Sequence, residues 1–450
     1  MKSRQTSQRR LMSDIRFDTI KDMKRYKNRV LDAVLADALQ AKAAVLIEGA
    51  KWCGKTTTAE QISKSIIYLN DPKRQEQYLL TAQTNPQRLL EGDSPRLIDE
   101  WQIAPELWDA IRFDVDHSDG DGKYILTGSA VPLDEEAKKK IHHTGTGRFA
   151  WIKMRPMALF ESEESSGSVS FAELFSGKVR LGDAMPHTLE EIAYLTCRGG
   201  WPKATEKTGR TALRQAFDYV DAIVNTDISR VDDIRRDPDL ALRIMKSLAR
   251  LQGTQSAVSA IKADLVPNLP KGGVHENTIF SYIGALKKLF VVEDMPAWCP
   301  NLRCKTPVRT TDTRYYTDPS IATAALGLGP DDLMNDLKTF GLFFETLVAR
   351  DLRTYAEAND GKICHYRDKS GLECDAVMHL RNGKYGLVEV KIGGEALIAE
   401  GREKLNKLAE EIDTKRMKAP SFRMIVVAEG DYAYQANDGT LICPVGCLRP

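Results

Sequence analysis

The chain has 450 residues, of which 64 are lysine or arginine and 63 are aspartate or glutamate, so its formal net charge is +1. This length accommodates about two to four domains with their own cores, and the near-neutral charge excludes a global attraction to nucleic acids or membrane surfaces. No apolar run is long enough to span a bilayer, and the 8 cysteines lack zinc-ligand spacing, so we expect a cytoplasmic protein with reduced thiols and no membrane partner.

The first segment, residues 1–30, is basic and polar and lacks the apolar core of a signal peptide. It predicts an N-terminal arm, and the sequence leaves open whether this arm is disordered, contacts phosphate groups or begins an amphipathic helix. Residues 43–47 are then continuously apolar, which predicts a buried strand near the start of a first folded domain over residues 31–187.

A glycine-rich loop follows this strand directly and completes the pattern G-x-x-x-x-G-K-[ST], with a helix predicted over residues 57–65. This setting of strand, loop and helix distinguishes a phosphate-binding loop from a chance match. Its backbone N–H groups would surround the phosphates of ATP, while Lys55 would reach the β- and γ-phosphates and the Thr56 hydroxyl would bind Mg²⁺. We expect the nucleotide to contact Gly49, Ala50, Lys51, Trp52, Cys53, Gly54, Lys55, Thr56 and Thr57.

A second strand, predicted over residues 95–98, ends in two acids, Asp99 and Glu100. Asp99 matches the aspartate that holds Mg²⁺ at the end of a Walker B strand. Glu100 would act as the general base that polarises the attacking water. An acidic pair at a strand end is otherwise a solvated loop, but Lys55 and Thr56 upstream favour the nucleotide interpretation. The pattern therefore predicts hydrolysis of ATP as well as binding.

A third strand, residues 123–126, ends at Thr127, which is either a sensor of the γ-phosphate or a plain exit from the strand. Arg148 is the candidate for a finger that stabilises charge on the transferred phosphate. It would act in cis or across the interface of a homo-oligomer, and the alternative is an ordinary surface arginine. Residues 162–170 are rich in serine and glutamate, which predicts a flexible surface insertion.

The middle of the chain is predicted to be helical. Residues 188–245 form a helical segment that Gly199-Gly200-Trp201-Pro202 interrupts, and this turn is interpreted as one that orients the flanking helices. Residues 246–325 have the rhythm of a winged helix, with three helices followed by a strand. The third helix offers two lysines, Lys287 and Lys288, so contact with DNA and packing against a neighbouring domain both stay open.

The last third, residues 326–450, is predicted to contain a helix, three strands, a helix and a strand, at 340–356, 363–367, 372–380, 385–391, 396–412 and 422–428. Asp375 lies on the second strand, and alternation along the third aims Glu389 and Lys391 at one face. Asp375 and Glu389 would hold Mg²⁺ or Mn²⁺, with Glu345 completing the metal shell. Lys391 would orient or deprotonate the water that attacks a phosphate. The alternative is a solvated charge pair on a strand edge.

Together these motifs resemble a widespread prokaryotic family that joins an AAA-type P-loop ATPase, a winged helix and a C-terminal domain of the restriction-endonuclease-like, PD-(D/E)xK-type fold. The resemblance covers nearly the whole chain and rests most firmly on the phosphate loop and on Asp99-Glu100-Trp101-Gln102. Relatives usually carry isoleucine or valine where this chain has Trp101, a departure that leaves both acids in place. The resemblance implies this architecture and ATPase activity more firmly than a biological task.

The expected fold class is therefore α/β, with a parallel-sheet P-loop ATPase domain, a helical and winged-helix middle, and a C-terminal α/β domain. The expected function is a Mg²⁺-dependent ATPase whose nucleotide state controls a nuclease-like domain acting on DNA. Two alternatives stay open: an ATP-dependent switch whose C-terminal domain only binds partners, and a DNA-binding regulator that acts through the winged helix. The expected ligands are ATP and Mg²⁺, with Mn²⁺ as an alternative at the C-terminal site.

Overall fold

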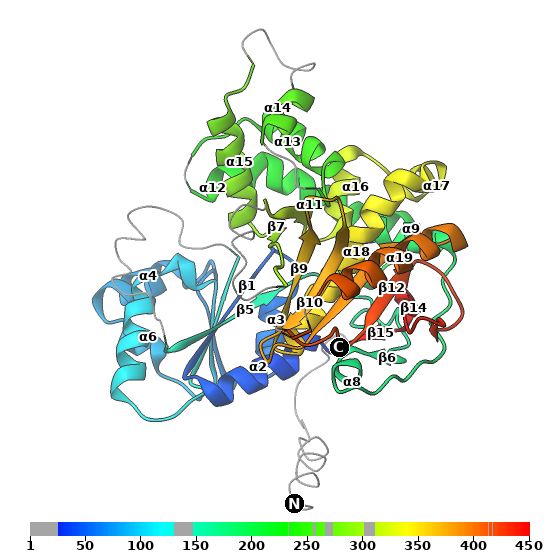
Figure 1. Cartoon of the computed structure of the whole chain (residues 1–450). Helices are drawn as coiled ribbons and strands as arrows, with labels where there is room; N and C mark the ends of the chain where they lie inside the picture. The colour runs from blue at the N-terminus through cyan, green and yellow to red at the C-terminus, as the bar shows by residue number, and fades with distance from the viewer. Residues whose placement is uncertain are drawn as a thin grey trace, which may run out of the picture.

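A computed structural model describes residues 26–129, 147–232, 234–254, 258–265, 273–300, 311–412, 414–415 and 417–450. Figure 1 shows an α/β unit built from the N-terminal part of the chain, a second built from the C-terminal part, and a helical region between them in sequence. Within the described residues, we find no helix with the length and apolar character needed to cross a membrane. Most of the predicted N-terminal arm lies outside these residues.

The N-terminal sheet has five parallel strands in the order β2-β3-β4-β1-β5. They are β1 (Ala44–Gly49), β2 (Ser65–Tyr68), β3 (Arg96–Asp99), β4 (Tyr124–Gly128) and β5 (Phe149–Met154). Because the strands run in one direction, their carboxyl ends meet at one edge, where ligands bind in sheets of this kind. The three predicted strands are confirmed as β1, β3 and β4, and β1 passes directly into the glycine-rich loop.

Helices cover both faces of this sheet, and a short 3₁₀ turn follows β3. They are α2 (Val30–Ala41) and α3 (Lys55–Glu60) on one face, with η1 (Trp101–Ile103), α4 (Gln75–Thr84), α5 (Gln87–Leu90) and α6 (Glu106–His117) on the other. Alternate side chains of β1 divide between the faces, since Val45 shares a core with Leu35 whereas Leu46 shares one with Trp108. The predicted bounds of the helix over residues 57–65 were wrong, because α3 begins at Lys55 and ends at Glu60. Ser65 already belongs to β2, whose β-branched Ile66 and Ile67 favour a strand.

The middle region is helical, as predicted. Its elements are α8 (Phe171–Phe175), α9 (Leu189–Arg198), α10 (Pro202–Thr205), α11 (Gly209–Ala222), the π-helical turn η2 (Ile223–Asp227), α12 (Ile228–Arg230), α13 (Pro238–Arg250), α14 (Val258–Leu265) and α15 (Glu276–Lys288). A two-stranded antiparallel sheet follows, formed by β7 (Val292–Met295) and β8 (Thr313–Tyr316). The three helices α13 to α15 and the strand β7 come in the predicted order, and the winged-helix assignment stays a prediction.

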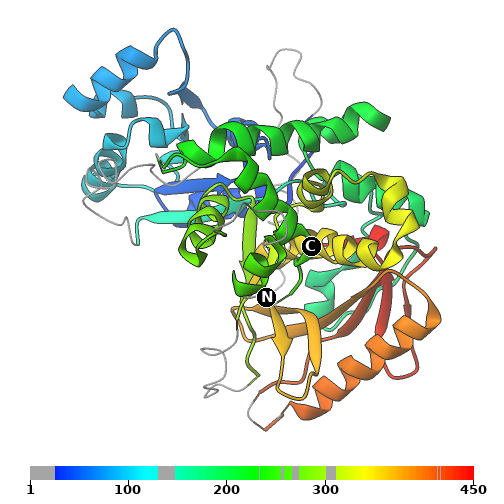
Figure 2. The ribbon, with the colours of Figure 1, turned by 90° about the horizontal axis from the view of Figure 1, so that it is seen from above.

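The C-terminal unit is a mixed sheet in the order β13-β14-β12-β11-β10-β9. Two helices that pack mainly against the helical middle, α16 (Pro319–Leu326) and α17 (Pro330–Asn335), precede it. Its elements are α18 (Leu337–Ala358), β9 (Gly361–Arg367), β10 (Glu373–Leu380), β11 (Tyr385–Lys391), α19 (Glu395–Glu411), β12 (Arg423–Val427), β13 (Tyr434–Gln435), β14 (Leu441–Pro444) and the turn η5 (Val445–Cys447). α18 and α19 lie on opposite faces of the sheet (Figure 2). The predicted elements are confirmed, and β13 and β14 were not predicted.

Residues 162–170 do not form the flexible surface insertion that their composition predicted. Their last two residues are β6 (Val169–Ser170), which pairs in parallel with β15 (Leu448–Arg449) near the end of the chain. The Ser165 hydroxyl, which is buried, donates to the carbonyl oxygen of Leu448 at 2.7 Å. The prediction was wrong because two of these serines, Ser165 and Ser170, are buried and donate hydrogen bonds to the backbone of Leu448 and Pro450.

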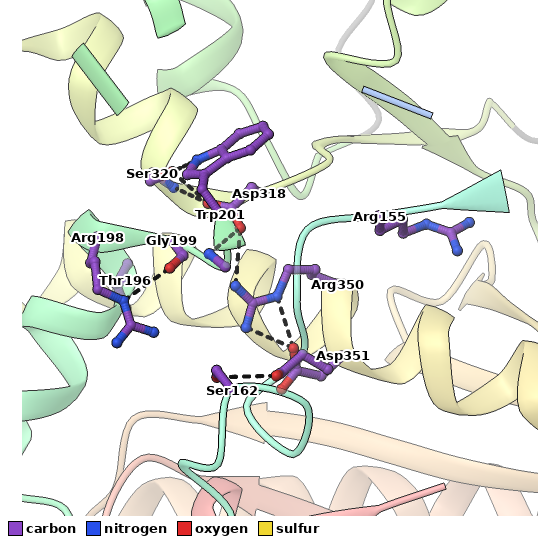
Figure 3. A network of polar contacts seen from close by, with 12 residues as sticks. Arg155, Ser162, Thr196, Arg198, Gly199, Trp201, Asp318, Ser320, Arg350 and Asp351 are labelled. Carbon is purple, nitrogen blue, oxygen red and sulfur yellow. Dashed lines mark hydrogen bonds and ion pairs between the residues drawn. The ribbon is translucent and has the colours of Figure 1, made fainter. Parts of the chain in front are cut away.

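A buried polar network fixes α18 against the helical middle (Figure 3). The guanidinium of Arg350 lies 3.0 Å from Asp318 and 2.8 Å from Asp351, and all three side chains are buried. Asp318 also accepts a 2.9 Å hydrogen bond from the backbone N–H of Gly200. A Cβ at Gly200 would collide with the carbonyl oxygen of Met157, so only glycine allows this close approach. The glycine pair therefore joins α9 to α10 as an orienting turn.

Candidate functional site

The glycine-rich loop has the backbone of a phosphate-binding loop. Gly49 and Gly54 both have positive φ angles, +156° and +104°, which let the chain turn sharply between β1 and α3. The ammonium group of Lys55 donates to the carbonyl oxygens of Gly49 and Ala50, each at 2.9 Å. This buried lysine thus lies inside the loop, at the N-terminus of α3, where backbone N–H groups and the helix dipole favour an anion.

Three oxygen-bearing side chains meet beside the loop. The hydroxyls of Thr56 and Thr127 each donate to the same carboxylate oxygen of Asp99, at 2.6 Å. Asp99 is buried at the carboxyl end of β3, and Thr127 lies opposite it on β4. Hydroxyl and carboxylate oxygens are the ligands that Mg²⁺ prefers, so the donor set of Thr56 and Asp99 fits the predicted ion. Thr127 therefore supports Asp99, and its contact with the γ-phosphate stays a prediction.

Glu100 follows Asp99 and is held in a strained conformation. Its φ is +56°, in the left-handed region that glutamate rarely adopts. Its carboxylate accepts hydrogen bonds from the Gln102 amide and, at 3.4 Å, from the Ser129 hydroxyl. All three side chains line the same cavity as Lys55. Strained residues of this kind concentrate at functional sites, and the position suits the predicted general base.

A cavity of about 1140 Å³ opens next to the loop. Its walls come from the segment before α2, the loop itself, α10 and the turn η2–α12, with Tyr26, Pro202 and Val231 among the lining residues. Ligand sites usually measure about 300–1,000 Å³. The cavity is therefore large enough for a nucleoside triphosphate.

The loop is also attached to the helical middle. The ammonium group of Lys51 lies 2.6 Å from the carboxylate of Asp227 on η2. Trp52 has a positive φ of +66°, and its ring lies 5.5 Å from that of Tyr219 on α11. These two side chains point from the loop toward the helices, whereas the phosphate-binding N–H groups belong to the backbone. Any ligand in the loop therefore also faces η2 and α12.

Arg148 lies at the opposite edge of the sheet from this cavity. It precedes β5, whose first residue, Phe149, pairs with Ala44 at the amino end of β1. The phosphate-binding loop begins at Gly49, five residues after Ala44 along β1, which corresponds to roughly 17 Å at a rise of about 3.3 Å per residue. Arg148 forms an ion pair with Asp116 of α6. The prediction of a finger in cis was therefore wrong, because parallel pairing separates the two ends of β5; action across a subunit interface stays a prediction.

The C-terminal unit brings together the four residues predicted for its site. Asp375 on β10 accepts a 2.8 Å hydrogen bond from the backbone of Val390, and Glu389 lies 2.7 Å from the ammonium group of Lys391 on the same strand. Glu345 on α18 accepts a 2.5 Å hydrogen bond from the Tyr315 hydroxyl of β8. Glu389 is fully buried, and its second oxygen, Oε1, has no hydrogen-bond partner within the described residues.

Mutual repulsion shapes the acidity of these groups. Burial, followed by the charge of Asp375, raises the pKa of Glu389 to about 8. The same two causes raise the pKa of Glu345 well above its ordinary value. Burial alone would lower the pKa of Lys391, but Asp375 and Glu389 raise it. A bound cation would relieve this repulsion, and the carboxylate set with its unpaired oxygen suits Mg²⁺ or Mn²⁺ chemically.

The described residues nevertheless contain no group of three or more His, Cys, Asp or Glu side chains placed closely enough to hold a metal ion as they stand. The metal role of Glu345, Asp375 and Glu389 therefore stays a prediction. The DNA interpretation of α15 has less support, because Lys287 forms an ion pair with Asp294, and Lys288 lies 3.1 Å from Asp232.

Sequence reasoning missed several residues that line the ATP-sized cavity, among them Lys203, Asp227 and Arg230. No motif contains them. They reach the cavity because α10 follows the turn after α9, and because the continuous helical stretch of α11, η2 and α12 passes beside the loop, where Asp227 binds Lys51. Only Pro202, within the quoted glycine turn, gave a signal near them.

Three family descriptions match parts of the chain. Residues 41–163 match the family described as AAA domain, residues 189–332 match a domain of unknown function (DUF8612), and residues 340–448 match another (DUF4143). No curated protein matches the chain. The AAA match, together with the loop geometry, shows a P-loop ATPase domain of the AAA type.

Solved structures similar to the chain include a Walker-type ATPase of Pyrococcus abyssi, with 14% identity, a TM-score of 0.41, and coverage of 70% of this chain and 99% of the other. They also include the ORC1 protein of Aeropyrum pernix, solved in complex with DNA, with 15% identity, a TM-score of 0.24, and coverage of 68% and 92%.

Proposed function

We propose that this protein hydrolyses ATP with Mg²⁺ and that its nucleotide state controls the C-terminal unit, which acts as a metal-dependent nuclease on DNA. One observation carries the ATPase part: Thr56 and Asp99 meet at 2.6 Å beside Lys55, at the mouth of a cavity of about 1140 Å³. The nuclease part rests on the meeting of Asp375, Glu389 and Lys391 on adjacent strands.

Hydrolysis uses residues already placed around the loop. Thr56 and Asp99 would hold Mg²⁺, which would supply positive charge beside the phosphates. Lys55 exchanges its two carbonyl partners for the β- and γ-phosphate oxygens, and the backbone N–H groups of the loop hold the same oxygens. Glu100 orients the attacking water and accepts its proton, while Gln102 and Ser129 fix the glutamate carboxylate.

A continuous set of contacts joins the loop to the C-terminal acids. Arg29 donates to the carbonyl oxygens of Cys53 in the loop and of Arg155, each at 2.8 Å. The Arg155 guanidinium in turn forms hydrogen bonds of 2.8 and 2.9 Å with Glu293 on β7. Glu293 pairs in register with Tyr315 of β8, whose hydroxyl donates to Glu345. A shift of the loop on nucleotide binding would thus be felt at Glu345.

At the C-terminal site, Asp375 and Glu389 would hold the divalent ion, which would stabilise charge on an attacked phosphodiester. Lys391, whose ammonium group reaches Glu389, would orient the attacking water. The alternative is that the C-terminal unit binds a partner without cleaving. The lack of a formed metal-binding group among the described residues favours this second candidate, an ATP-dependent switch.

The test is to incubate the full chain with supercoiled plasmid and Mg²⁺ or Mn²⁺, with and without ATP. Lys391→Ala and Lys55→Ala are compared with Lys407→Ala, which removes an exposed lysine of α19. The proposal is supported if the plasmid is nicked and if this nicking is abolished by Lys391→Ala, altered by Lys55→Ala and unchanged in Lys407→Ala. ATP hydrolysis without cleavage under any condition would instead support the switch.

A further inference from the structure

Most of the basic side chains that line the ATP-sized cavity already have partners. Lys27 pairs with Glu163, Arg29 with Glu161, and Lys51 with Asp227, while Lys55 binds two carbonyl oxygens of the loop. Arg230, at the end of α12, also lines the cavity, is exposed, and forms no ion pair or hydrogen bond with the described residues. The guanidinium group of Arg230 therefore lines the nucleotide cavity, and no carboxylate of the described residues pairs with it.

The local structure explains why Arg230 points there. α11, η2 and α12 form one continuous helical stretch, in which Asp227 and Arg230 are three residues apart and so lie on the same face. Asp227 holds Lys51 of the phosphate loop at 2.6 Å, with only 10% of its side chain exposed. This ion pair fixes the turn against the loop. Arg230, one turn further on, therefore lines the same cavity as Lys55 and Thr56 of the loop.

We infer that Arg230 contacts the terminal phosphate of ATP bound to its own chain and stabilises the charge that develops there during hydrolysis. This inference rests on the proposed ATPase function and assigns to Arg230 the role in cis that the sheet topology excludes for Arg148. A guanidinium presents a planar fork of N–H donors that matches two phosphate oxygens at once. Since ADP lacks the terminal phosphate, Arg230 discriminates ATP from ADP.

The experiment compares Arg230→Ala and Arg230→Lys with wild-type protein and with Arg214→Ala, which removes an exposed arginine of α11 that does not line the cavity. Steady-state hydrolysis gives kcat and KM, and calorimetry gives affinities for ADP and for a non-hydrolysable ATP analogue. We expect Arg230→Ala to lower kcat on the order of 10²-fold and to weaken the analogue about 10-fold, with ADP affinity within about twofold of wild type. Arg230→Lys should be intermediate, and Arg214→Ala should match wild type.

Three outcomes would overturn the inference. One is an unchanged kcat and an unchanged preference for the ATP analogue in Arg230→Ala. Another is an equal loss of ADP and analogue affinity, which would show a structural role. The last is activity restored by mixing Arg230→Ala with Lys55→Ala chains, which would show action between subunits. A wild-type protein that neither binds nor hydrolyses ATP would instead refute the proposed ATPase function. Lys55→Ala distinguishes the two failures: it loses activity relative to wild type if only the Arg230 inference is wrong, and it behaves like wild type if the ATPase function itself is wrong.

Discussion

Replacing Arg350 by methionine tests the idea that a buried ion network fixes α18, the helix that carries Glu345. The substitution keeps much of the side-chain volume but removes the cation that lies 3.0 Å from Asp318 and 2.8 Å from Asp351. Both carboxylates are buried, so they would be left without their charge partner. Removing one member of a buried ion pair costs about 3–5 kcal/mol. We expect a decrease of this size in the free energy of unfolding.

The same variant has a pH signature with a definite sign. Burial raises the pKa of Asp351 to about 6, and Arg350 opposes this rise. Because the folded-state pKa lies above the ordinary value, the folded protein binds the proton more tightly than the unfolded chain, and stability falls as pH rises toward 6. Without Arg350 the pKa of Asp351 rises further, so this loss continues to higher pH. The deficit of Arg350→Met should therefore be larger at pH 8 than at pH 5.

Urea unfolding at both pH values measures these differences. The control is Arg214→Met, which removes an exposed arginine that pairs with Asp218 at 3.4 Å on the surface of α11. Such surface pairs contribute about 0–1 kcal/mol, so the control should unfold close to wild type at either pH. A loss below about 1 kcal/mol in Arg350→Met, or a deficit that does not grow with pH, would show that the network does not hold α18.

Three further predictions concern single side chains. Thr127→Val removes a hydrogen bond to Asp99 and should lower kcat for ATP about 10-fold in a steady-state assay; an unchanged kcat would refute this support role. Gly200→Ala should destabilise the chain in thermal unfolding by about a few kcal/mol, because the new methyl group would collide with the backbone of Met157. The control Gly284→Ala, whose methyl group would enter open space on α15, should stabilise the chain by about 0.5–1 kcal/mol. Equal effects of the two substitutions would contradict the packing account. Glu389→Gln should match wild-type stability near pH 4 and exceed it above pH 8, because the raised pKa of Glu389 makes its ionisation destabilising. If the urea midpoints of the variant and of wild type change with pH in parallel, this prediction is wrong.

The chemistry of the nucleotide site could be predicted from the sequence because it is local. The glycine pattern, the strand before it and the acids after β3 lie within short stretches whose spacing is constrained by phosphate binding. The proximity of Asp375, Glu389 and Lys391 could be predicted for a similar reason, since alternation along a strand determines which side chains share a face.

The parts that could not be predicted depend on contacts between distant segments. Arg148 follows the phosphate loop in sequence but lies at the other edge of the sheet, and only the pairing of β5 with β1 reveals this. The serines of residues 162–170 suggested solvent exposure because their partners near Leu448 are unknown until the fold is known. Arg230 carries no motif, and its place over the cavity follows from the packing of α11, η2 and α12.

The pairing of β6 with β15 has a consequence for how the chain is made. Ser165 and its partner Leu448 are separated by 283 positions, and ribosomes add about 5–20 residues per second. Each growing polypeptide therefore carries β6 and the apolar Phe171 beside it for roughly 15–60 s before the covering strand has been synthesised. During that interval the first half of the protein exposes a strand edge, the kind of surface on which nascent chains aggregate or recruit chaperones.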